Sequence, residues 1–176
     1  MCLFWSLSGQ AQRKSPPRRD YINGYIINSY GDTLLGKIKL TQQFKGAVRI
    51  IPESDTLERV QRIGLDEIKE VHLNIMLFEK VTYKGKERLF EKVANGHYNL
   101  FAFTYLGAEI PENRYLLKLE KEVLEITEGN FMKMAERFLF DNTELREKIF
   151  SRKAGFPQVI DLFRQYNLWK VKEKTN

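Results

Sequence analysis

Two different spacings of apolar residues divide this chain near residue 127. Up to that point apolar and polar residues mostly alternate, in short runs separated by Gly, Pro, Asn or Asp, which is typical of β-strands. From about residue 130 the apolar residues recur every three or four positions, which is typical of amphipathic helices. The sequence therefore predicts a β-rich body over residues 20–127 and a helical segment over residues 128–170.

The clearest local signal in the β-rich body is Leu89–Tyr105, where two β-prone runs flank Asn95-Gly96. A type I′ hairpin turn needs positive φ at both central residues, and Asn and Gly tolerate that conformation. A two-residue loop would place Phe90 opposite Phe101. The hairpin would be apolar on both faces, so we expect it in the middle of a sheet or in a barrel wall.

Alternation also predicts the strands that surround this hairpin. They lie at residues 21–27, 33–40, 47–51, 56–62, 68–73, 75–83, 114–120 and 123–127. A short helical turn at residues 66–69 is an alternative to the predicted start of the strand at residues 68–73. About ten short strands with turns between them indicate an antiparallel β-sandwich or an open β-barrel.

Three amphipathic helices are predicted after the strands. The first runs over residues 130–140, the second follows a capping box formed by Asp141 and Glu144, and the third begins near Pro157. Burial of each Phe or Leu on these helices is worth roughly 1.5–3 kcal/mol, so we expect the helices to pack on the sheet. The predicted fold is therefore α+β, with one domain over residues 20–170 and a polar tail at residues 171–176.

The net charge of +6 is unevenly distributed. Residues 21–127 carry 15 basic and 15 acidic side chains, whereas residues 1–20 and 128–176 each carry an excess of three positive charges. A nucleic-acid-binding face normally concentrates Lys and Arg on one element. The neutral β-rich body argues against a nucleic-acid partner, and no apolar run approaches the roughly 20 residues of a transmembrane helix.

The first 12 residues resemble the second half of a secretory signal peptide. Residues 2–7 are apolar, and Gly9 and Ala11 are the small residues that signal peptidase requires before a cleavage at Gln12. A basic leader region is missing, so the true start would lie upstream; an uncleaved tail is the alternative. Residues 13–19 read as a basic linker. We therefore expect export to the periplasm or cell surface.

Three stretches together carry a family resemblance: GYIINSYGDTLLGKIKL, LFEKVANGHYNLFAFTY, and FLFDNTELREKIF with FPQVIDLFRQYN. They resemble a set of small exported bacterial proteins of unassigned function, over most of residues 20–167. The shared motifs are turns, a hairpin and helix caps. The resemblance implies no catalytic residues.

Catalytic, metal and cofactor motifs are weak in this sequence. The two histidines, His72 and His97, lie in separate strand regions, whereas a zinc site needs three or four converging ligands. No serine lies in a nucleophile elbow, and no phosphate-binding glycine pattern is present. We therefore expect no catalytic residues, no cofactor and no metal. The carboxylates mostly alternate with lysines, which makes a carboxylate-dependent hydrolase the weakest alternative.

The aromatic residues are the best candidates for binding. Twelve Phe, eight Tyr and two Trp exceed the needs of a minimal core, and Tyr and Trp are enriched at interfaces. A possible ligand or partner face comprises Tyr21, Tyr25, Tyr30, Tyr83, Tyr98 and Trp169. The sequence thus favours a non-enzymatic binding module for an unknown protein or envelope component. A carrier of a small apolar ligand, lidded by the helices, is the alternative.

Overall fold

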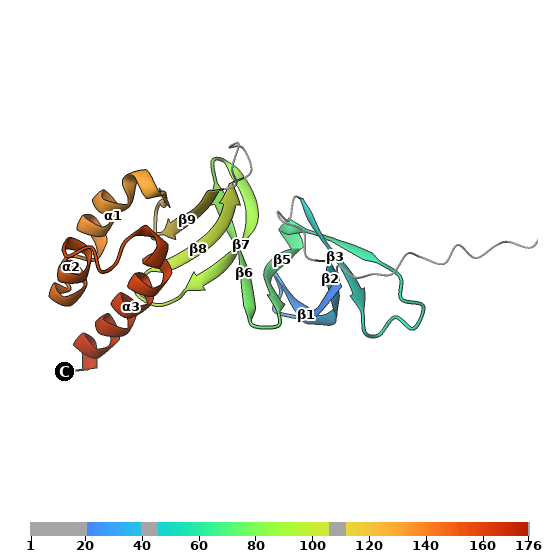
Figure 1. Cartoon of the computed structure of the whole chain (residues 1–176). Helices are drawn as coiled ribbons and strands as arrows, with labels where there is room; N and C mark the ends of the chain where they lie inside the picture. The colour runs from blue at the N-terminus through green and yellow to red at the C-terminus, as the bar shows by residue number, and fades with distance from the viewer. Residues whose placement is uncertain (1–20, 40–45, 106–111, 176) are drawn as a thin grey trace, which may run out of the picture.

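Ten antiparallel strands form one continuous sheet in the computed structural model, which describes residues 21–39, 46–105 and 112–175. The strand order is β10-β9-β8-β7-β6-β5-β1-β2-β3-β4 (Figure 1). The strands are β1 (Tyr21–Asn28), β2 (Thr33–Lys39), β3 (Ala47–Pro52), β4 (Gln61–Gly64), β5 (Ile68–Leu73), β6 (Met76–Tyr83), β7 (Lys86–Ala94), β8 (Asn99–Tyr105), β9 (Glu112–Lys118) and β10 (Val123–Ile126). The predicted signal peptide and basic linker lie outside the described residues.

Strands β1–β5 form the N-terminal lobe. Strands β1–β4 follow one another as a meander, and a short 3₁₀ turn, η1 (Leu65–Glu67), then returns the chain so that β5 pairs with β1. Alternate residues of these strands point to one side, where Ile26, Ile38 and Ile50 are at most 1% exposed. The predicted period of two therefore separates a buried apolar inner face from an outer face of mixed polar, aromatic and apolar residues.

Strands β6–β10 curl in a second lobe, the C-terminal lobe. In a flat sheet β6 and β10 would lie about 19 Å apart, because neighbouring strands are spaced by about 4.8 Å. Instead the Tyr83 hydroxyl at the end of β6 donates a hydrogen bond to the Glu125 carboxylate on β10. Lys84 Nζ lies 3.4 Å from the same carboxylate. The sheet must bend to allow these contacts, and its inner face is filled by Val81, Phe90, Phe101 and Leu116.

Strands β6 and β7 belong to both lobes and join them (Figure 1). Val81 and Phe90 point into the C-terminal curl, whereas Phe78 and Leu89 point the other way, into the core of the N-terminal lobe. The sheet therefore curls first toward one face and then toward the other. This explains why the central hairpin is apolar on both faces, as the sequence predicted.

The helices cover the outer face of the C-terminal lobe (Figure 1). They are α1 (Phe131–Phe138), α2 (Thr143–Phe150) and α3 (Val159–Thr175), with 3₁₀ turns η2 (Glu128–Asn130) and η3 (Phe156–Gln158) before α1 and α3. Their apolar faces pack with Leu100, Leu117 and Ile126 of the sheet. The predicted α+β fold with packed C-terminal helices is confirmed, and α3 extends to Thr175, into the segment predicted as a polar tail.

The register of the central hairpin differs from the prediction. Four residues, Asn95–Tyr98, separate β7 from β8, and a bulge between Lys92 and Ala94 shifts the pairing, so that Phe101 lies opposite Lys92. The two-residue turn is excluded because Asn167 of α3 binds the backbone of Tyr98 and holds it away from the strand ladder. Phe90 and Phe101 still share one face, as predicted.

Two other local predictions were wrong. The strand predicted at residues 56–62 begins only at Gln61, because the Asp55 carboxylate accepts hydrogen bonds from Leu57 N and Arg59 Nε and folds this segment into a loop. The cap of α2 is Asn142, whose side chain accepts a hydrogen bond from Leu145 N at 3.0 Å. Asp141 is thereby left to contact α3.

Candidate functional site

The structure does not bring the six residues of the predicted aromatic face together. Tyr21 and Tyr25 lie on the outer face of β1, and Tyr30 lies at the exposed tip of the β1–β2 turn. Tyr83 lies at the interior of the C-terminal curl, and Tyr98 and Trp169 lie on either side of Tyr166 of α3. Each location has its own chemistry.

The outer face of the N-terminal lobe carries an apolar and aromatic row across three strands. Tyr25 of β1 pairs with Leu35 of β2 on one side and with His72 of β5 on the other. The Tyr25 and His72 rings are stacked, with centroids 4.3 Å apart and planes inclined by 11°. His72 Nε2 lies 3.1 Å from the Glu70 carboxylate. Leu35 is 53% exposed, so the row is open to solvent.

A second row on this outer face is cationic. Arg49 of β3 lies directly opposite Arg62 of β4, and both side chains are exposed. Lys39 of β2 lies beside Arg49, one step along the register that pairs Ile38 with Ile50. Tyr21 of β1 lies opposite Lys39. Side chains that face each other on neighbouring strands have Cβ atoms about 5 Å apart, so the three cations are close neighbours.

These cations were missed by reasoning from the sequence. The β-rich body has equal numbers of acidic and basic residues, and that balance conceals any local concentration of charge. Each cation is an ordinary outward-facing residue of its own strand. The strand order brings Lys39, Arg49 and Arg62 into one row. The sequence indicated only that each of them occupies an outward-facing, polar position in its own strand.

Tyr83 belongs to a carboxylate cluster that holds the C-terminal curl together. Besides the Tyr83 hydroxyl, Glu125 binds Arg114 Nη1 at 2.6 Å and has Lys84 nearby. Burial would raise the pKa of Glu125, but the hydrogen bonds from Tyr83 and Arg114 outweigh it and hold this pKa below its ordinary value. A general acid needs a raised pKa. Glu125 is therefore suited to a structural role.

Tyr98 and Trp169 take part in a contact between the hairpin loop and α3. Tyr98 and Tyr166 are stacked with centroids 5.4 Å apart, and Trp169 lies 5.4 Å from Tyr166. The Tyr166 hydroxyl donates to Asp141, which also binds Lys170 at 3.0 Å. Burial and the hydrogen bond to Asp141 raise the pKa of Tyr166, so it remains a neutral donor. This cluster attaches α3 to the sheet.

Within residues 21–39, 46–105 and 112–175, no group of three or more His, Cys, Asp or Glu side chains is placed to hold a metal ion. The helices in these ranges lack the combination of length and apolar character that a membrane crossing requires. Glu125 and Asp141 are each held by cations and a tyrosine rather than by a second carboxylate.

The outer face of the N-terminal lobe is therefore the best candidate for a binding site. It combines a partly exposed apolar and aromatic row with a cationic row, whereas Tyr83, Tyr98 and Trp169 are engaged in packing. Tyr30 lies at an exposed turn outside both rows. Comparison of the chain with protein-family models, with curated proteins and with solved structures finds no match in any of the three.

Proposed function

We propose that the protein is an exported, non-enzymatic binding module whose partner docks on the outer face of the N-terminal lobe. The observation that carries the proposal is the row formed by Leu35, Tyr25 and His72 on the outer face of the sheet, in which Leu35 is 53% exposed and the stacked Tyr25 and His72 rings are half-buried. Exposed apolar surface next to polar groups is typical of an interaction site.

The carboxylate chemistry supports a binding role rather than catalysis. Glu125 and Asp141 both have pKa values below their ordinary range, because neighbouring cations and tyrosine hydroxyls outweigh the effect of burial. Both groups are already satisfied by partners within the fold. A hydrolase that used them would need one carboxyl with a raised pKa.

The packing of the described residues does not favour the alternative of a lidded carrier. The buried residues on the inner faces of both curls are at most 9% exposed, and partly buried side chains, among them Ile22 and Tyr83, pack against them. The helices pack on the outside of the C-terminal lobe. Export is supported by the apolar residues 2–7 and the small residues Gly9 and Ala11. The resemblance to small exported bacterial proteins agrees with this proposal and stays a hypothesis.

Site-specific crosslinking in the native host tests the binding face. A photoreactive amino acid at position 35 is expected to crosslink to an envelope component, and Tyr25→Ala is expected to weaken the crosslink. Position 132 is the matched control, since Met132 is 44% exposed but lies on α1. Equal crosslinking at both positions would contradict the proposal. An intact Met1 in the protein purified from its host would contradict export.

A further inference from the structure

The cationic row contains a like-charge contact that does not help the fold. Arg49 and Arg62 lie directly opposite each other, and like charges in this position destabilise a sheet. Among the described residues neither arginine forms an ion pair, whereas Lys37, two residues before Lys39 on β2, lies 3.7 Å from Glu58. Charge repulsion between exposed arginines is reduced when an anion binds between them. The arrangement is therefore complementary to an anionic ligand.

The shape of the row indicates a polymer rather than a small anion. Its three cations belong to three successive strands, so at about 4.8 Å per strand they extend over roughly 10 Å. They form a line across three strands on the outer face of the sheet. Several anionic groups along an extended chain match this spacing, and arginine binds carboxylate or phosphate groups with two parallel hydrogen bonds.

The aromatic neighbours argue against a nucleic acid. Proteins that bind single-stranded nucleic acids stack successive bases on open aromatic rings. Here one face of the Tyr25 ring is covered by His72, and Tyr21 is half-buried. Tyr21, which lies directly opposite Lys39, can instead contact the less polar face of a sugar ring while the cations bind the acidic groups.

We propose that the outer face of the N-terminal lobe binds an anionic polysaccharide of the cell envelope through Arg49, Arg62 and Lys39. This inference rests on the proposed function and names the chemical class of its ligand. The polymer lies across β2, β3 and β4, with its acidic groups on the cationic row and a sugar ring toward Tyr21 at the end of that row.

Binding of the full chain to polygalacturonate tests the inference, with neutral dextran and a 15-residue oligothymidine as comparison ligands. The chain is expected to bind polygalacturonate but not dextran, and more weakly as salt rises. The double variant Arg49→Gln with Arg62→Gln is expected to lose at least about tenfold in affinity, because two charge-assisted contacts are removed.

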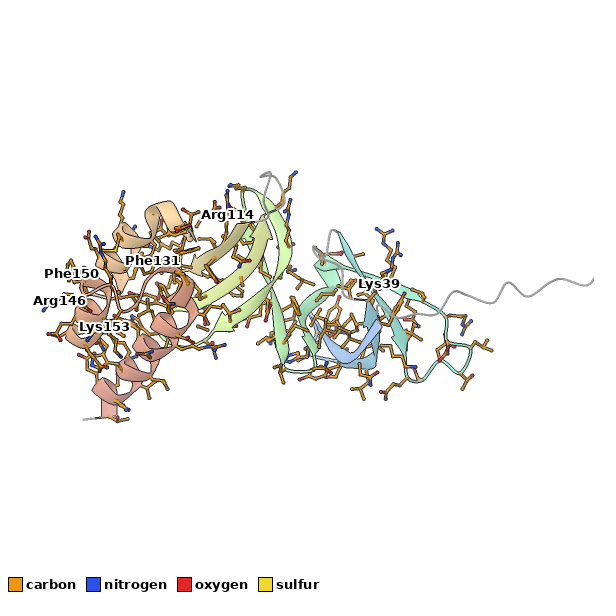
Figure 2. The ribbon with its side chains drawn as sticks, viewed as in Figure 1. Lys39, Arg114, Phe131, Arg146, Phe150 and Lys153 are labelled. Atoms are coloured by element: carbon orange, nitrogen blue, oxygen red, sulfur yellow. The ribbon has the colours of Figure 1, made fainter. Side chains whose placement is uncertain are left out.

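A matched variant separates the site from overall charge. Arg146→Gln with Lys153→Gln removes the same charge from two exposed residues of the helical layer, at the other end of the molecule from Lys39 (Figure 2). Its affinity is expected to stay within about twofold of the wild type. An equal loss in both double variants would show nonspecific attraction and overturn the inference.

The stability of the double variant and its binding to the comparison ligands provide further tests of the inference. The Arg49 and Arg62 double variant is expected to unfold at the same or a higher temperature, because a like-charge contact is removed; a clearly lower temperature would show a structural role instead. Tighter binding of the oligothymidine through the same arginines would replace the polysaccharide with a nucleic acid. If polygalacturonate fails to bind while crosslinking at position 35 persists, this inference falls and the proposed function stands. If neither polygalacturonate binding nor crosslinking at position 35 is observed, the inference and the proposed function are both wrong.

Discussion

Asn167 provides the most direct test of how the helices hold the sheet. Its side chain belongs to α3, is 4% exposed, and binds the backbone of Tyr98 in the hairpin loop. Tyr98 N donates to Asn167 Oδ1 and Asn167 Nδ2 donates to Tyr98 O, both at 2.8 Å. The amide thus replaces the strand partner that this loop residue lacks.

The variant Asn167→Ala removes both hydrogen bonds and leaves two backbone groups without these partners. Each loss is worth about 1–2 kcal/mol, so we expect the free energy of unfolding to fall by about 2–4 kcal/mol. For a protein of this size 1 kcal/mol corresponds to about 2–4 °C, so the melting temperature should fall by about 5–15 °C. Urea and thermal denaturation monitored by circular dichroism measure both quantities.

Two further variants sharpen the measurement. Gln165→Ala changes an exposed side chain of the same helix and should alter stability by less than about 0.5 kcal/mol. Asn167→Asp keeps the acceptor but places a carboxylate against Tyr98 O, which raises the pKa of the new carboxyl in the folded state. Its stability relative to the wild type should therefore improve as the pH falls. A loss below about 0.5 kcal/mol for Asn167→Ala would refute the reasoning.

Other parts of the fold make separate predictions. The pKa of Glu125 is lowered in the folded state, so its contribution to stability is present above the ordinary value of 4.5 and is lost as the pH falls through the folded value. Glu125→Gln should therefore show a shallower loss of stability below pH 4.5 in acid titrations; an unchanged slope would count against this cluster. Phe101→Ala should cost about 3–5 kcal/mol in urea denaturation, because Phe101 is 0% exposed inside the C-terminal curl; a cost below 1 kcal/mol would mean that the interior collapses. Gly24→Ala should reduce expression of folded protein, because its Cβ would lie 2.1 Å from His72 O across β1 and β5; a normal melting temperature would contradict this.

The central hairpin shows how far local signals reach. Asn95-Gly96 correctly marks the reversal of the chain, because Gly96 adopts a φ of 145° that few other residues tolerate. The length of the loop could not be read from the same residues. It depends on Asn167, which lies 69 positions away from Tyr98 and whose two hydrogen bonds compete with the strand ladder.

The candidate binding site illustrates the same limit. Tyr21 and Tyr25 could be assigned to the same face of one strand from their spacing. Arg49 and Arg62 could be assigned to outward positions in two other strands, but their contact depends on register. A shift of register by one residue would turn either side chain to the opposite face. Local alternation does not specify that register.

The sequence by itself determined the class of fold, the change from strands to helices near residue 127, and the apolar character of both faces of the central hairpin. These features depend on hydrophobic periodicity, which is a property of neighbouring residues. Only the tertiary structure decided that one sheet curls twice in opposite directions, that Tyr83 meets Glu125 across the second curl, and that three cations form one row. Those features depend on contacts between distant strands, whose partners are chosen by packing of the whole chain.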